Sequence, residues 1–131
     1  MPMIYKPRAD GYEIKHPVLD CPGGNTFVGD IFTSTAEPGK EMTSGFYRQE
    51  DGEALKYTYD YDEMKIILEV VGEYIISDET GLSVSVKPGD VFYFEKGSTV
   101  TFKNTGGYGY AFFVGARPAD TAWIYFNKYG N

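Results

Sequence analysis

The chain has 131 residues, with 19 Asp and Glu against 12 Lys and Arg and a formal net charge of −7. This length suits one domain that buries a core without disulfides, and the acidic balance argues against nucleic acid and anionic membranes as partners. The one cysteine, Cys21, excludes an intramolecular disulfide and a thiolate zinc cluster. Because no apolar run has the length of a signal peptide or a membrane span, we expect a cytoplasmic protein.

The first third of the chain predicts short strands separated by turns. Residues 3–5 and 12–15 are candidate strands, and residues 26–34 alternate well enough to form another. The sequence Glu-Pro-Gly-Lys at 37–40 predicts a turn, because Pro presets its own φ and Gly adopts positive φ freely. A further strand is expected at residues 42–49.

The middle of the chain carries the most regular pattern. Residues 55–61 alternate strictly between apolar and polar side chains, so one face of a strand would carry Leu55, Tyr57, Tyr59 and Tyr61. Residues 60–97 continue as the β-branched and aromatic runs MKIILEVV, EYIIS, LSVSV and VFYFE, with turns at 78–81 and 88–90. Strands of this length and spacing predict an antiparallel sandwich or barrel.

The last part of the chain predicts two more strands, at residues 99–103 and 108–115, with a turn between them. Residues 119–129 predict either a final strand or a short helix that packs outside through Trp123 and Tyr125. No long apolar pattern repeats every 3.6 residues, so we expect an all-β fold with little helix.

Two passages resemble the paired sequence motifs of the cupin superfamily, a group of small jelly-roll barrels. The passage that is similar to the second motif begins at Gly89, has Glu95 where Pro is usual, and then meets Gly97. It reaches Val100 where the family usually has a His ligand, and it ends on Asn104. The glycines and the asparagine are therefore kept, while the imidazole is lost.

The passage that resembles the first cupin motif has also lost its imidazoles. Tyr57 and Tyr59 occupy the two His positions, and Glu63 occupies the acidic position. The closing glycine of the motif falls on Val70, and a glycine appears only at Gly72. This offset predicts a small insertion or a bulge.

Within the cupins, four short segments are most similar to the EutQ-like branch of ethanolamine-utilisation proteins: Gly45-Phe46-Tyr47, Tyr61-Asp62-Glu63, Leu68-Glu69 and Pro88-Gly89-Asp90-Val91. The resemblance covers about residues 42–115. It implies a single cupin (RmlC-like) jelly-roll β-barrel domain over residues 1–131, with N-terminal strands in 1–34 and a C-terminal segment at 119–131. Because cupins host many activities on one scaffold, it implies the fold more than the reaction.

The substitutions at the ligand positions predict a barrel without a metal. A divalent metal takes about three or four nitrogen or oxygen ligands, and only Glu63 keeps a good donor. Tyr57 and Tyr59 would bind only as phenolates, and Val100 offers no ligand atom. His16 lies outside both motifs. We therefore expect no cofactor, and a metal bound at Glu63 is the alternative.

The residues that replace the ligands favour acid–base chemistry. Burial in an aromatic barrel is expected to raise the pKa of Glu63 towards neutrality, so that it carries protons as the catalytic acid or base. Tyr57 and Tyr59 point the same way and would stabilise a developing oxyanion. Either Tyr47 or Arg48 faces the same cavity, depending on register, and an inward Arg48 would hold a substrate carboxylate.

The predicted function is a small-molecule enzyme, of the lyase or isomerase type, that uses metal-independent acid–base chemistry for isomerisation, dehydration, elimination or cyclisation. Further candidates for substrate binding are Val100, Phe102 and Phe112. The alternatives are a metal-dependent cupin with non-standard ligands and a non-catalytic cupin in which the tyrosines only fill the barrel. Because the sheet edges of such barrels pair across a two-fold axis, we expect a homodimer.

Overall fold

Two long antiparallel strands, β4 (Glu63–Asp78) and β7 (Thr99–Gly115), organise the fold in the computed structural model, which describes residues 3–122. Five shorter strands pair with them, in the order β1-β2-β7-β4-β5, with β3 on β7 and β6 on β4. Their bounds are β1 (Thr26–Thr33), β2 (Thr43–Glu50), β3 (Leu55–Thr58), β5 (Ser83–Ser85) and β6 (Val91–Phe94). Every strand pairing in the sheet is antiparallel, which confirms the predicted all-β class.

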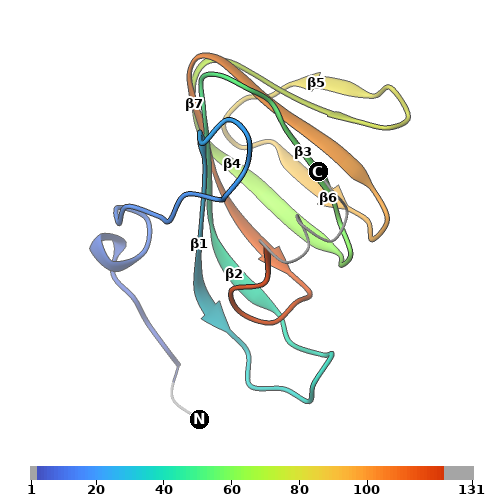
Figure 1. Ribbon diagram of the computed structural model, residues 1–131. Helices are drawn as coiled ribbons and strands as arrows, with labels where there is room; N and C mark the ends of the chain where they lie inside the picture. The colour runs from blue at the N-terminus through green and yellow to red at the C-terminus, as the bar shows by residue number, and fades with distance from the viewer. Residues whose placement is uncertain (1–2, 123–131) are drawn as a thin grey trace.

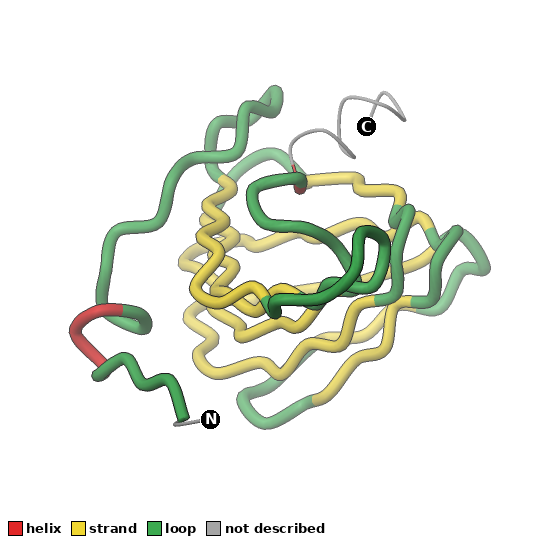
Figure 2. The backbone as a smooth tube through the Cα atoms, turned by 90° about the horizontal axis from the view of Figure 1, so that it is seen from below, coloured by secondary structure: helices red, strands yellow, loops and turns green. Residues whose placement is uncertain are grey.

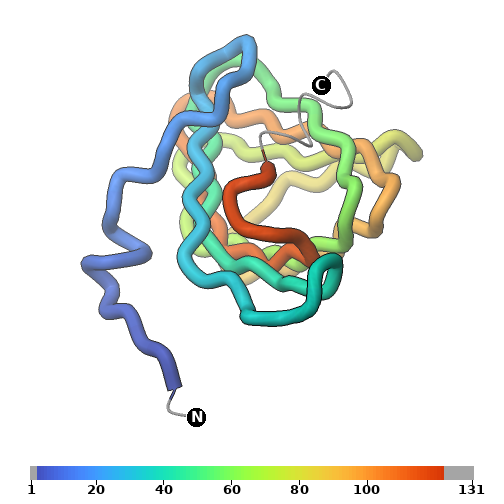
Figure 3. The backbone as a smooth tube through the Cα atoms, turned by 60° about the horizontal axis from the view of Figure 1, so that its bottom comes forward, coloured from blue at the N-terminus to red at the C-terminus, as the bar shows by residue number. Residues whose placement is uncertain are grey.

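The sheet closes on itself because each long strand serves two sets of neighbours. The first part of β7, residues 99–102, lies between β3 and the end of β4, whereas residues 108–115 lie between β2 and the start of β4. Figure 1 shows both long strands bending between these parts, and Figure 3 shows the strands arranged as a ring. The two layers therefore face each other across one interior.

A bulge at Gly72 makes the bend in β4. The pairing with β7 shifts register between Val71 and Glu73, and Gly72 has a φ of +76°. A Cβ atom at Gly72 would lie 2.4 Å from the carbonyl oxygen of Thr105, so only glycine fits there. The buried Asn104 side chain braces the bulge by donating to the Val71 carbonyl oxygen at 3.1 Å. The offset in the first cupin motif is thus a bulge.

Several expected boundaries are corrected by the long strands. The runs MKIILEVV and EYIIS form one strand, β4, and the two strands expected at 99–103 and 108–115 form one strand, β7. The backbone of β7 continues through residues 104–107 because its pairing with β4 resumes on both sides of the bulge. The strands expected at 26–34 and 42–49 are confirmed as β1 and β2.

The N-terminal strands expected at 3–5 and 12–15 are wrong. The chain there is irregular apart from one 3-10 turn, η1 (Arg8–Asp10), and it lies outside the barrel (Figure 2). Met3 and Ile4 are exposed, so residues 3–5 bury no apolar face that would hold a strand in place. Most of the segment expected at 119–129, with Trp123 and Tyr125, lies outside the described residues.

The inward face of the barrel follows the predicted alternation. Every second residue from Leu55 to Ile67 is buried, across the end of β3, the connection and the start of β4. This phase aims the tyrosines at 57, 59 and 61 into the barrel interior together with the side chains at 63 and 65. The core of the fold and the predicted site therefore occupy the same space.

Candidate active site

A carboxylate, an amine and a phenol meet in the barrel interior, which we call the lumen. Glu63, the first residue of β4, is 4% exposed, and its Oε2 accepts a hydrogen bond from the Tyr59 hydroxyl at 2.7 Å. The Nζ atom of Lys65 lies 3.5 Å from the same oxygen, and Lys65 is 2% exposed. Glu63 and Lys65 share a face because side chains two residues apart on a strand point the same way.

Aromatic rings surround the amine. The Nζ atom of Lys65 lies 4.0 Å from the ring centroid of Tyr47, 4.5 Å from that of Phe102 and 5.5 Å from that of Phe94. The ring faces attract the charged form of the amine. Burial nevertheless lowers the pKa of Lys65 from its ordinary value, and the neighbouring charge of Glu63 only partly opposes this effect. The neutral amine is therefore more accessible here than on a surface lysine.

The phenols around Glu63 are proton donors. Burial raises the pKa of Tyr59 well above its ordinary value, and the negative charge of Glu63 raises it further. Tyr59 packs edge to face against Tyr57 and Tyr61, with ring centroids 4.8 and 5.4 Å apart. The hydroxyls of Tyr57 and Tyr61 lie 2.9 Å apart within hydrogen-bonding distance. This wall holds the Tyr59 hydroxyl in place, protonated and directed at the carboxylate.

The space left in the lumen is small. The cavity beside Glu63 and Lys65 has a volume of about 20 Å³, which is room for about one water molecule. Tyr47, Phe102 and Phe113 are among its walls, and Ala122 lies at its edge. Any substrate of the lumen must therefore be small or must displace residues at the mouth.

The register of β2 decides between Tyr47 and Arg48. Tyr47 is buried in the lumen wall, so Arg48 points to the outer face of the sheet, where its Nε donates to Glu50 at 2.8 Å. The predicted role of Arg48 as a carboxylate clamp in the lumen is wrong, because successive side chains on a strand face opposite sides.

The same alternation sorts the remaining binding candidates. Phe102 lines the lumen cavity as predicted, but Phe112 lies on the outer face against Phe46, and Phe113 takes the inward position. Val100 is buried in the core, where it pairs with Tyr57, and it does not line the cavity. Phe112 and Val100 are thus removed from the candidate site.

Lys65 is the lumen residue that sequence reasoning missed. Its signal was available, because position 65 continues the alternate phase of Tyr57, Tyr59, Tyr61 and Glu63. A lysine in a strand is almost always exposed. For this reason the alternation of inward-facing residues was not extended to position 65. The amine becomes visible only when the inward face is followed beyond Glu63.

The donor set does not fit the metal that cupins commonly hold. The carboxylate of Glu63 already faces the Lys65 amine at 3.5 Å, which places a basic group where a cation would have to lie. The raised pKa of Tyr59 opposes a phenolate ligand. Within residues 3–122, no three His, Cys, Asp or Glu side chains gather in a way that could hold a metal ion.

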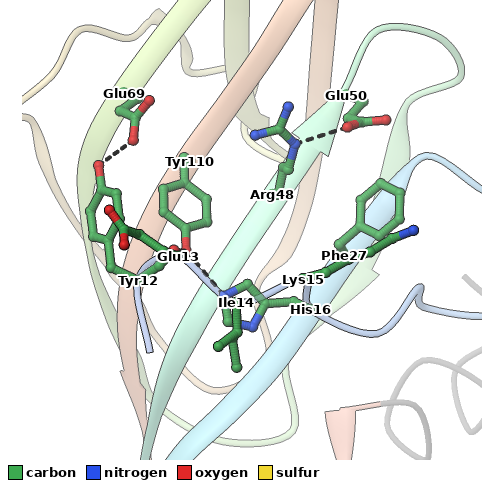
Figure 4. Close-up of a pocket in the computed structure, with 10 residues that line it drawn as sticks. All are labelled: Tyr12, Glu13, Ile14, Lys15, His16, Phe27, Arg48, Glu50, Glu69 and Tyr110. Atoms are coloured by element: carbon green, nitrogen blue, oxygen red, sulfur yellow. Dashed lines mark hydrogen bonds and ion pairs between the residues drawn. The ribbon is translucent and has the colours of Figure 1, made fainter. Parts of the chain in front are cut away.

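A second hollow lies on the outer face of the sheet, beneath residues 12–16 (Figure 4), with a volume of about 330 Å³. Its lining carries three carboxylates and two cations: Glu13, Glu50, Glu69, Lys15 and Arg48. Glu69 accepts hydrogen bonds from Tyr108 at 2.7 Å and from Tyr12, which lower its pKa. Arg48 and Glu50 pair with each other on β2, and the hydrogen bond from Tyr12 to Glu69 fastens the N-terminal segment to the barrel.

His16 is part of that fastening. The Tyr110 hydroxyl donates to the Tyr12 carbonyl, so the Nε2 atom of His16, 3.0 Å from the Tyr110 oxygen, must be the donor in their contact. The Nδ1 atom is then the unprotonated nitrogen of the ring. Its lone pair is buried and has no hydrogen-bond partner among the described residues. His16 is 6% exposed, and burial lowers its pKa.

The stability of the fold should therefore fall as the pH drops from about 7 to about 5, because the unfolded chain protonates His16 near its ordinary pKa of about 6.5 while the folded chain resists. His16 is the only histidine of the chain, so it should dominate the slope between pH 6 and 7, roughly. Urea midpoints measured across this range should show the slope in the wild type and a flatter curve in His16→Phe. Equal slopes in both proteins would contradict the assignment.

Comparison with known proteins gives one family and one fold. A family model described as ethanolamine utilisation protein EutQ matches residues 16–123. The protein named acetate kinase EutQ from Escherichia coli (strain K12) is 35% identical over 78 residues, which cover 60% of this chain and 32% of that protein. This chain thus spans about a third of the length of that curated relative.

Solved structures show the same fold. A protein of unknown function from Rhizobium leguminosarum matches with a TM-score of 0.65 and 24% identity, over 90% of this chain and all of that one. A cupin superfamily protein from Desulfitobacterium hafniense matches with a TM-score of 0.54 and 15% identity, over 76% of this chain and 84% of that one. These matches confirm the cupin jelly roll. No helix in the described part of the chain has the length and apolarity that crossing a bilayer demands.

Proposed function

The chain belongs to the EutQ family within the cupin superfamily, and from this membership and the lumen geometry we propose that it is an enzyme that moves protons on a small metabolite without a metal. The supporting observation is the buried group of Glu63, Tyr59 and Lys65, joined at 2.7 and 3.5 Å. A buried charge pair is costly to keep, so a purely structural core gains little from it.

Glu63 and Tyr59 have distinct chemical roles in this proposal. The Glu63 carboxylate accepts a proton from the substrate and returns it at a later step. The Tyr59 hydroxyl donates to Glu63 in the free protein and turns to the substrate oxygen on which negative charge develops, and its raised pKa keeps its own proton in place. The wall of phenols and rings excludes water and strengthens both interactions. Such a site suits isomerisation, dehydration, elimination or cyclisation.

The name of the Escherichia coli relative describes an acetate kinase, and we do not extend that activity to this chain. A bound nucleotide requires a pocket of roughly 300 Å³ or more. The lumen cavity, at about 20 Å³, is far smaller. The outer hollow is large enough, but its excess of carboxylates repels phosphates.

The experiment follows proton chemistry directly. The full chain is incubated in D₂O with a panel of small hydroxy acids, hydroxy aldehydes and ketones, and proton NMR records exchanged or converted C–H groups. Glu63→Gln should lower the rate by about 10²–10⁴-fold, the usual contribution of a positioned general base. Tyr59→Phe should remain folded and lose about 10²–10³-fold, as expected for an oxyanion donor.

The exposed Glu95 provides the matched control, because Glu95→Gln makes the same chemical change at a residue that does not line the lumen cavity and should leave the rate unchanged. Turnover that survives Glu63→Gln would overturn the proposal. So would a stoichiometric transition metal in protein purified without chelator, if that metal is lost with Glu63→Gln.

A further inference from the structure

The proton transfers assigned to Glu63 and Tyr59 leave the lumen amine without a task. We propose that Lys65 is a nucleophile that forms a Schiff base with a small aldehyde or ketone in the lumen, next to the Glu63 carboxylate at 3.5 Å. This inference rests on the proposed function, because Glu63 carries the protons that the covalent step requires. It adds a substrate class to that function.

The position of Lys65 favours a reactive amine over a packing residue. Lys65 lies in the middle of the sheet, paired with Phe92 on β6 and Phe113 on β7, so its backbone is fixed on both sides. A methionine would fill the same space without the cost of burying an amine. The lowered pKa that burial gives Lys65 supports the same reading, because only the neutral amine attacks a carbonyl carbon.

The chemistry balances with the groups present. The Lys65 ammonium first passes one proton to Glu63. The lone pair of the resulting neutral amine attacks the carbonyl carbon, the C=O π electrons move to oxygen, and Glu63 gives its proton to that oxygen, which forms an N-protonated carbinolamine. The amine proton passes to Glu63, which returns it to the departing hydroxyl, and water leaves as the iminium forms. The iminium then acts as an electron sink, so Glu63 can remove a proton from the adjacent carbon and form an enamine. Hydrolysis reverses the sequence and frees Lys65.

The shape of the lumen limits the carbonyl compound. The cavity holds about one water molecule, and rings form most of its wall, so even a compound of a few heavy atoms must displace part of that wall to reach the amine, and a larger one is excluded. The Tyr59 hydroxyl donates to the same Glu63 oxygen that faces Lys65, so it can turn to donate to the oxygen of the carbinolamine. Selection by size and by a carbonyl group is therefore the expected specificity.

Reductive trapping tests the Schiff base. The full chain is treated at neutral pH with acetaldehyde and sodium cyanoborohydride, and peptide mass mapping locates each added ethyl group. Lys56 on β3 is exposed and serves as the internal reference. Because burial lowers the pKa of Lys65, more of its amine is neutral, and Lys65 should be labelled faster than the exposed Lys56. Benzaldehyde, which is too large for the lumen, should modify Lys56 alone.

Protein unfolded in urea provides the matched control, and there Lys65 and Lys56 should react equally. The Schiff base is overturned if Lys56 gains the ethyl group in the folded protein while Lys65 does not, or if benzaldehyde labels Lys65 as fast as acetaldehyde does. A failure of the Schiff-base proposal can be told apart from a failure of the proposed acid–base function. In that case the NMR rates would still fall with Glu63→Gln, although no adduct forms on Lys65.

Discussion

Replacing Glu63 by Gln should lower the free energy of unfolding by about 3–5 kcal/mol, because the Lys65 amine then lies buried without its counter-charge. The double variant E63Q/K65M should recover this loss and reach or exceed the wild type, since apolar replacement of a buried pair is often neutral or stabilising by about 1–4 kcal/mol. The glutamine side chain in both variants keeps an oxygen that can accept from Tyr59. Urea unfolding curves, with the m-values compared, measure both quantities.

The double variant separates the two explanations of the buried pair. Full recovery of stability with complete loss of activity means that the pair serves the chemistry. A double variant that stays several kcal/mol below the wild type would instead make the pair a structural element, against the proposed function. Glu95→Gln, the same change on an exposed residue, should alter stability by less than about 0.5 kcal/mol.

Much of the barrel could be predicted because its strongest signals are local. The alternation from Leu55 to Tyr61 depends only on the period of a strand, and the turn at 37–40 depends on its own Pro and Gly. That turn is confirmed by a hydrogen bond from the Lys40 amide to the Glu37 carbonyl at 3.0 Å, with a φ of +88° at Gly39.

Errors arose where partners far apart in the sequence decide the structure. Gly72 lies two residues beyond the position at which the closing glycine of the motif is expected, and it bends a strand that continues, because β7 pairs on both sides of it. Residues 12–15 pack on the outer face through Tyr12, whose hydroxyl contacts Glu69. The local sequence does not indicate such a contact. The short run at residues 12–15 therefore predicts a strand instead.

The inward and outward sides of two strands could not be assigned from the sequence either. On β2 and on β7, aromatic residues stand next to each other, at Phe46 with Tyr47 and at Phe112 with Phe113. Either phase would bury one ring and expose the other. The outward-facing rings of Phe46 and Phe112 pack edge to face against each other, with ring centroids 5.4 Å apart. Neighbouring aromatics thus hide the register that sets Arg48 outside the lumen.

The mouth of the lumen should open when Asp30 is replaced by Asn. Arg117 is 2% exposed, and its two terminal nitrogens donate to the Asp30 carboxylate at 3.0 and 2.9 Å. Burial lowers the pKa of Arg117, but Asp30 and Tyr61, through hydrogen bonds and charge, together outweigh this effect and hold the pKa above its ordinary value. Breaking such a buried pair from one side costs about 3–5 kcal/mol, and D30N should lose that amount in urea unfolding.

This clamp also ties the last described residues to the barrel. The Asp30 carboxylate accepts from the Asp120 amide at 2.6 Å, and Thr43 donates to the Arg117 carbonyl at 2.7 Å, so the segment that ends at Ala122 is held at the edge of the lumen. In the D30N variant, acetaldehyde should therefore label Lys65 faster than in the wild type, although no residue of the lumen site has changed. Lys56 is again the internal reference. Unchanged labelling together with the full loss of stability would mean that the clamp stabilises the fold without controlling access to the amine.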